Sequence, residues 1–204
     1  LTNRANANAA ALAEAIGDRL TAVERDQRWS VQQSGTTASL RGFSAASSLV
    51  AWAGGNRGTV LRTVNGGVVW ENVAVRGADS LDFRDVYGVS SRVAYAMSAG
   101  PAERGQARIY KTFNGGQHWT LQWSDTTRGV FLDGMAFWDA THGLAFSDPV
   151  DGKLVILRTD DGNTWQRIDP ANIPPGLPGE ASFAASGTSI AVQGRSNAWI
   201  ATGG

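Results

Sequence analysis

From residue 29 onward, the apolar residues of the chain come in short runs that Gly, Ser and Thr interrupt. Such runs, bounded by turn-forming residues, are typical of β-strands. Residues 1–28 follow another pattern, because Leu12, Ile16, Leu20 and Val23 recur at the spacing of one helical face. These patterns predict an amphipathic helical segment over 1–28 and a β domain over 29–204. The helix would pack on the main domain or on a neighbouring chain; a lipid-facing anchor is the alternative, although its polar face is not strongly basic.

One stretch of the β domain recurs three times. Its copies, which we call boxes, are residues 62–70, 111–119 and 158–165, and the third is one residue shorter. The Trp that closes each box recurs at a period of about 50 residues, which is typical of propeller blades built of four short strands. The repeat therefore predicts an all-β fold, a β-propeller.

The residue types of the box explain why it recurs. Asn-Gly and Asp-Gly tolerate positive φ and close a tight turn between two strands. The Thr hydroxyl and the Asn or Asp side chain can accept hydrogen bonds from nearby backbone amides, and the Trp offers apolar surface to a neighbouring hairpin. We interpret the following as structural residues: Thr63, Asn65, Gly67, Trp70, Thr112, Asn114, Gly116, Trp119, Thr159, Asp161 and Trp165.

Two companion patterns set the predicted blade boundaries. An aromatic residue flanked by small residues recurs at Trp52, Tyr95, Phe146 and Trp199, and an alternating strand opens each unit. The predicted blades are 29–70, 71–119, 120–165 and an incomplete 166–204. About three and a half blades do not close a ring, since propellers usually have four to eight. We expect a segment of a longer propeller, with completion by a second copy or a partner as the alternative.

Composition narrows the possible partners. The chain has 18 basic and 18 acidic residues, and this balance argues against nucleic acid as the main partner. It has no Cys, which excludes disulfides, thiolate catalysis and Cys-ligated metals. No apolar run approaches the roughly 18 residues of a direct membrane span, and no signal peptide is visible, which a mature form would have lost.

The boxes resemble the Asp-box, or BNR, repeats of sialidase-type propellers. The whole unit, from 39–43 through 50–55 and 59–63 to Trp70, is similar to the photosystem II stability/assembly factor family and its bacterial relatives. The resemblance covers about 29–204, and Asn163 departs from it where the other boxes have Gly. Family members in oxygenic phototrophs are seven-bladed propellers that bind assembly intermediates of a membrane reaction centre.

That resemblance implies a function. It implies a non-enzymatic protein-binding module, an assembly or stabilising subunit of a membrane-associated complex, photosynthetic in the family's best-known members. It also implies an extracytoplasmic location, periplasmic or lumenal, and a membrane protein complex as the partner. We expect no cofactor and no metal, because His118 and His142 lack companions at ligand spacing.

A carbohydrate-active enzyme is the alternative function. A sialidase-like site would need a tyrosine nucleophile, and the candidates are Tyr87, Tyr95 and Tyr110. Other glycoside hydrolases use two carboxylates across the sugar bond, for which the candidates near strand ends are Asp82, Asp85, Asp133 and Asp148. Acidic residues at strand ends more often cap turns, which makes this the weaker hypothesis.

Five residues are candidates for partner binding. Arg62, Lys111 and Arg158 hold the same place before each box and would form a partial basic ring that docks acidic protein segments. The alternative is that they only solvate strand edges. Trp123 and Trp138 have no counterpart in the other units, so they are candidates for an interface or for outward positions of a strand.

Overall fold

A computed structural model describes residues 30–185 and 187–203. Every element named below belongs to one compact unit, residues 33–204. The helical segment predicted for 1–28 lies outside the described residues. Within the described residues the regular structure consists of β-strands and two short 3-10 helices, so the all-β prediction for this part is confirmed.

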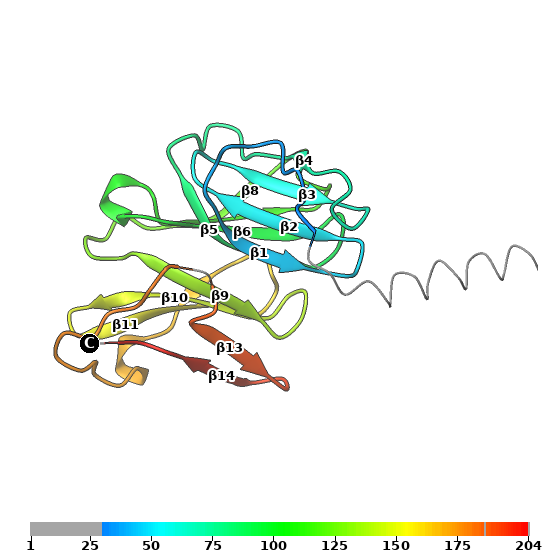
Figure 1. The fold of residues 1–204 in the computed structure, drawn as a ribbon. Helices are drawn as coiled ribbons and strands as arrows, with labels where there is room; N and C mark the ends of the chain where they lie inside the picture. The colour runs from blue at the N-terminus through cyan, green and yellow to red at the C-terminus, as the bar shows by residue number, and fades with distance from the viewer. Residues whose placement is uncertain (1–29, 186, 204) are drawn as a thin grey trace, which may run out of the picture. The chain divides into compact units, whose positions relative to one another are not determined.

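Three antiparallel sheets follow one another along the chain, each with four strands in chain order (Figure 1). The first contains β1 (Leu40–Ala45), β2 (Ala51–Gly55), β3 (Val60–Thr63) and β4 (Glu71–Asn72). The second contains β5 (Asp82–Gly88), β6 (Ala94–Ala99), β7 (Arg108–Thr112) and β8 (Thr120–Ser124). The third contains β9 (Leu132–Phe137), β10 (Gly143–Val150), β11 (Lys153–Thr159) and β12 (Gln166–Arg167). A hairpin of β13 (Ile190–Gln193) and β14 (Asn197–Ile200) comes last, and the 3-10 helices are η1 (Ala102–Arg104) and η2 (Pro170–Asn172).

The sheets end slightly later in the chain than the predicted blades. The strand that follows each box pairs with the strand that precedes it, as Leu61 with Asn72 and Leu157 with Arg167 show. The predicted boundaries at 70, 119 and 165 place these short outer strands in the next blade, whereas hydrogen bonding places them in the same sheet. The box is thus the turn between the third and fourth strands of one sheet.

The sheets pack face to face, and their first strands β1, β5, β9 and β13 lie next to one another in that order. Gly42 on β1 permits the close approach of strands β1 and β5, because an added Cβ would lie 3.0 Å from the Asp85 backbone on β5. Convergence of the first strands of successive sheets is the arrangement of propeller blades around an axis.

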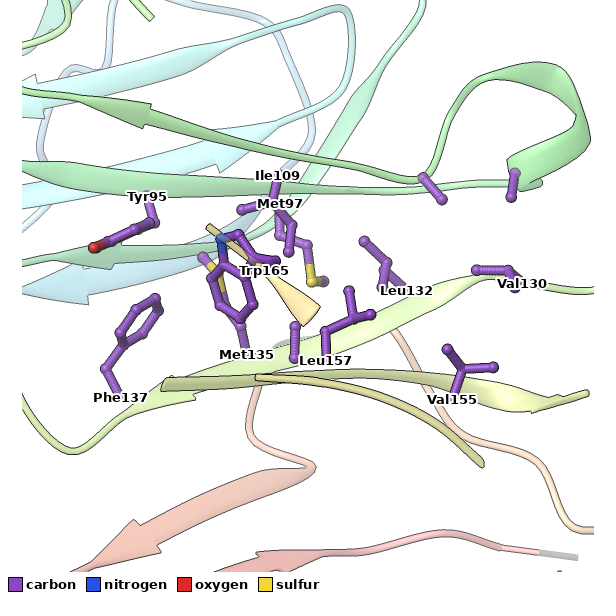
Figure 2. Close-up of a cluster of buried hydrophobic side chains, with 13 residues drawn as sticks. Tyr95, Met97, Ile109, Val130, Leu132, Met135, Phe137, Val155, Leu157 and Trp165 are labelled. Carbon is purple, nitrogen blue, oxygen red and sulfur yellow. The ribbon is translucent and has the colours of Figure 1, made fainter. Parts of the chain in front are cut away.

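The hydrophobic core is a series of layers between sheets. Trp52, Val60 and Phe83 belong to the layer between the first and second sheets. Tyr95, Met97 and Ile109 face Met135, Phe137 and Leu157 in the layer between the second and third, as Figure 2 shows. Leu144, Phe146 and Ile190 form a smaller layer between the third sheet and the hairpin. Each sheet is therefore stabilised by its neighbours, as in other repeat folds.

Candidate functional site

The three boxes share one hydrogen-bond network. In the second box, the Thr112 hydroxyl accepts from the N–H of Gly116 at 2.9 Å, and Asn114 Oδ1 accepts from the N–H of His118 at 2.9 Å. Thr63 and Asn65 in the first box make the same bonds to the N–H groups of Gly67 and Val69, at 2.9 Å each. The polar residues of the box thus satisfy the backbone of their own turn.

The third box makes an equivalent network with one residue fewer. Thr159 accepts from the N–H of Gly162, and Asp161 accepts from the N–H groups of Asn163 and Thr164. These bonds to Thr164 and Asn163 lower the pKa of Asp161 to about 2. Gly162 has φ +66°, but the shortened turn has no second position with positive φ, whereas the other boxes have two each. Asn163 therefore replaces Gly without strain.

The Trp that closes the second or third box packs on the sheet before it. Trp119 lies edge-on to Trp52 with ring centroids 6.1 Å apart, and its indole N–H donates to the Val73 carbonyl at 2.8 Å. Trp165 lies edge-on to Tyr95, with ring centroids 6.5 Å apart, and Figure 2 shows both side chains in the core between the second and third sheets. Trp119 and Trp165 are thus joints between sheets.

Two of the three basic residues of the predicted ring reach from their own sheet to the sheet that follows it in the chain. Arg62 donates to the Ser91 carbonyl of the second sheet at 2.9 Å. Lys111 donates to the Gly162 carbonyl of the third sheet at 2.7 Å, lies over the Tyr95 ring at 4.8 Å and is only 3% exposed. Burial lowers the pKa of the Lys111 ammonium, although Asp161 acts in the opposite direction.

Arg158, the third basic residue, has a different environment. Its side chain is 57% exposed and forms an ion pair with Asp160 at 2.7 Å. It stands opposite Leu144, just as Arg62 stands opposite Trp52 and Lys111 opposite Tyr95. By register, Leu144 and not Phe146 is therefore the counterpart of Trp52 and Tyr95. Of the three basic residues, Arg158 is the one that solvent reaches most freely.

The two Trp residues without counterparts are half-buried between sheets. Trp123 packs against the layer between the second and third sheets. Trp138 packs against the layer under the hairpin, and its indole N–H donates to the Asn197 carbonyl at 2.9 Å. Both contribute to the joints between sheets, and neither presents its whole ring to a partner.

A repeated β-bulge brings another set of residues together. One residue near the start of each first strand is left out of the pairing register, and these residues are Arg41, Arg84 and Asp133. A bulge redirects the side chain of the extra residue away from the regular alternation. The same irregularity in three successive sheets therefore turns three charged side chains toward one place.

That place is a pocket of about 300 Å³, which we call the bulge pocket. The three bulge residues line it together with Phe131, Asp148 and residues 182–185. Sequence reasoning considered Asp133 and Asp148 only as weak candidates and did not consider Arg41 or Arg84. The signal was present, since each charged bulge residue follows an apolar one and precedes Gly or Asp at 40–42, 83–85 and 132–134.

Two polar atoms on the wall of the bulge pocket are buried without a hydrogen-bond partner, namely Asp133 Oδ2 and Ser182 Oγ. Asp133 is 1% exposed, and burial together with the nearby charge of Asp148 raises its pKa to about 7. Asp148 Oδ1 accepts from the Ser182 N–H at 2.7 Å. Unpaired buried polar groups are costly, and a ligand that pairs them is favoured.

The other candidate catalytic residues have structural environments. Asp82 pairs with Arg84, and Asp85 accepts from the Met135 N–H. Burial raises the pKa of Tyr95 and of Tyr87, which is the wrong direction for a nucleophile. Within 30–185 and 187–203, no cluster of three or more His, Asp or Glu residues suits a metal ion, and no helix is long and apolar enough to span a bilayer.

No protein-family model and no curated protein matches the chain. Among solved structures, it is similar to YCF48 bound to a D1 peptide, with a TM-score of 0.55 and 20% identity over 70% of this chain and 43% of that chain. YCF48 from Cyanidioschyzon merolae gives a TM-score of 0.48 and 19% identity over 65% and 37% of the two chains. The GH74 enzyme of Niastella koreensis gives a TM-score of 0.44 and 16% identity, over 58% of this chain and 20% of that chain.

The chain spans less than half the length of these proteins. The resemblance to the photosystem II assembly-factor family is confirmed at the level of the fold, because YCF48 belongs to that family. The described residues thus form part of a β-propeller similar to that of YCF48.

Proposed function

We propose that the chain is a non-enzymatic β-propeller module that binds a segment of another protein at the bulge pocket. The observation that carries this proposal is the repeated bulge, which places a charged side chain from each of three successive sheets in one pocket. Bulges commonly lie beside functional sites, where they aim side chains. The pocket is small and open, and Phe183 on its wall is 62% exposed. An exposed aromatic beside buried polar groups suits an extended segment of a partner.

We further propose that the partner is a membrane protein complex outside the cytoplasm, periplasmic or lumenal, whose assembly the module supports. The support is the fold, since the structure with a TM-score of 0.55 is that of YCF48 bound to a D1 peptide. Arg158 is a second candidate contact, because it is exposed where Arg62 and Lys111 are engaged between sheets.

A carbohydrate-active enzyme is the second candidate. It is favoured by Asp133 and Asp148, two carboxyl groups in one pocket, one with a pKa raised toward that of a general acid. The Arg84 guanidinium, however, lies over the Phe131 ring at 5.7 Å, so this face of the ring is not available for stacking on a sugar. This contact places the enzyme hypothesis behind the binding module.

A comparison of peptide binding and glycoside hydrolysis distinguishes the binding module from the carbohydrate-active enzyme. The chain and an Asp133→Asn variant are probed with an array of random peptides and with chromogenic aryl glycosides. We expect peptides whose binding the substitution weakens, and no hydrolysis. Hydrolysis that Asp133→Asn abolishes would establish the enzyme instead, and an array without any bound peptide would reject the binding module.

An alkaline phosphatase fusion of the native gene product tests the location, since the reporter is active only outside the cytoplasm.

A further inference from the structure

We propose that the bulge pocket receives a basic side chain, a lysine or arginine of the partner segment, between Asp133 and Asp148. This inference rests on the proposed function and adds the chemistry of the residue that is recognised. It differs from the expectation drawn from the boxes, in which a basic ring would dock an acidic segment.

The first argument concerns the hydrogen-bonding groups that are free. Asp133 Oδ2 and Ser182 Oγ are buried on the pocket wall, and neither has a partner. The carboxylate oxygen can accept a hydrogen bond, and the hydroxyl can accept as well as donate. Asp148 uses Oδ1 for the Ser182 N–H. Both unpaired atoms can accept a hydrogen bond from an ammonium or guanidinium group, which offers several donors.

The second argument concerns the cations already present. Arg84 is occupied, because its Nε pairs with Asp82 Oδ2 at 2.8 Å, its Nη1 donates to the Ala184 carbonyl at 3.4 Å, and its guanidinium lies over Phe131. Arg41 is exposed on the wall of the same pocket. Backbone carbonyl groups of a bound segment can accept from Arg41 while the basic side chain reaches inward.

The third argument is electrostatic. Burial and the nearby charge of Asp148 raise the pKa of Asp133, although backbone hydrogen bonds and Arg84 act in the opposite direction. A cation placed between two carboxylates relieves their repulsion and favours ionisation of both. An acidic side chain in the same position would add a third negative charge to the buried wall, whereas a neutral apolar side chain would leave both unpaired atoms unsatisfied.

The rim suits the shape of such a side chain. Phe183 is exposed on the pocket wall. Lysine and arginine pack their apolar stems along such surfaces while the charged head lies in a polar environment.

The test uses three small probes that differ in one group: the Nα-acetyl methylamides of lysine, norleucine and glutamate. Each is titrated into the protein, and the backbone amide signals of Gly134 and Ser182 are followed by NMR. We expect the lysine probe to bind about tenfold more tightly than norleucine, the gain of one charge-assisted hydrogen bond, and the glutamate probe to bind least. Equal binding of lysine and norleucine, or preference for glutamate, would overturn the inference.

Variants assign the effect to the pocket. Asp133→Asn should abolish the preference for lysine, while Asp160→Asn, an aspartate on an exposed turn, should leave it unchanged. Ser182→Ala offers a second test if Asp133→Asn fails to fold, and it should weaken binding of lysine more than binding of norleucine. Should both Asp160→Asn and the pocket variants keep the preference, the site lies elsewhere. Peptides that bind in the array without preference for lysine would reject only this inference, not the binding module.

Discussion

The carboxylate of Asp85 accepts a hydrogen bond of 2.8 Å from the backbone N–H of Met135, and this bond joins the first strand of the second sheet to that of the third. Burial raises the pKa of Asp85 to about 7, although its bonds to the N–H groups of Met135 and Val86 act in the opposite direction. The joint between these two sheets therefore contains a carboxyl group that holds its proton up to neutral pH.

The free energy of unfolding should consequently fall as the pH rises from about 4 to about 7. In this window the folded chain binds a proton at Asp85 that the unfolded chain, with a pKa near 3.8, has lost. The shift corresponds to about 4 kcal/mol, and Asp133 acts in the same direction, since its pKa is also raised to about 7. Carboxylates with lowered pKa, such as Asp161, titrate below this window. Urea denaturation at several pH values measures the slope.

An Asp85→Asn variant isolates the contribution of this group. The amide oxygen can still accept from Met135, but the side chain cannot ionise. The variant should therefore be more stable than the natural chain above about pH 7, and its free energy of unfolding should fall less steeply with pH. Asp79→Asn, on the exposed surface, is the matched control. A stability that rises with pH in this window would contradict the argument.

Lys111→Met should destabilise the fold by about 1 to 3 kcal/mol, because it removes the donor to Gly162 and the cation above the Tyr95 ring. The matched control, Arg158→Met, removes an exposed basic residue at the equivalent register position and should change stability by less than about 0.5 kcal/mol. Urea denaturation measures both. If Lys111→Met instead weakened partner binding at unchanged stability, Lys111 would be a docking residue and not a joint.

Trp119→Ala should cost about 3 to 5 kcal/mol, since it opens a cavity against Trp52 and leaves the Val73 carbonyl without its donor. Trp119→Phe retains an aromatic ring but not the indole N–H, so it should cost less. Thermal unfolding followed by calorimetry compares the two. Similar losses in both variants would show that the hydrogen bond, and not the ring, stabilises this joint.

Gly116→Ala should destabilise the second box by more than Gly77→Ala does. Both glycines have positive φ, at +84° and +74°, so both variants bear the cost of that backbone conformation. An added Cβ at Gly116 would also meet the Val73 side chain at 2.5 Å, whereas nothing lies within 4 Å of one at Gly77. The difference in denaturation midpoint measures the steric part alone, and equal midpoints would show that Val73 moves aside freely.

The repeats in the sequence were sufficient to predict the architecture, because the box residues form their hydrogen bonds within their own turn. Thr112 and Asn114 bond the turn that contains them, so three copies imply three similar turns. The aromatic series was harder to align, since Leu144 occupies the position that spacing assigned to Phe146. The β10–β11 hairpin is longer than its counterpart in the first sheet, since 158 − 144 = 14 residues separate Leu144 from Arg158 and 62 − 52 = 10 separate Trp52 from Arg62. Spacing along the chain does not reveal such a difference in register.

The bulge pocket was not predicted, although its three bulge residues share a sequence context. Arg84 and Asp133 read as ordinary alternating positions in their strands, and only the register shows that they are extra residues turned to one side. Their proximity also depends on the stacking of separate sheets, which brings residues from distant parts of the chain together. Likewise, Lys111 reads as a surface residue at a strand end, and its burial becomes visible only when the third sheet covers it.

Four of the joints between sheets end on backbone carbonyl groups. Arg62 reaches Ser91, Lys111 reaches Gly162, Trp119 reaches Val73 and Trp138 reaches Asn197, each through the main-chain oxygen of the acceptor. A main-chain oxygen is present whichever amino acid occupies the position. A gene that duplicates one such unit therefore obtains a compatible neighbour at once, and the two copies are free to diverge in their side chains while remaining fastened to each other.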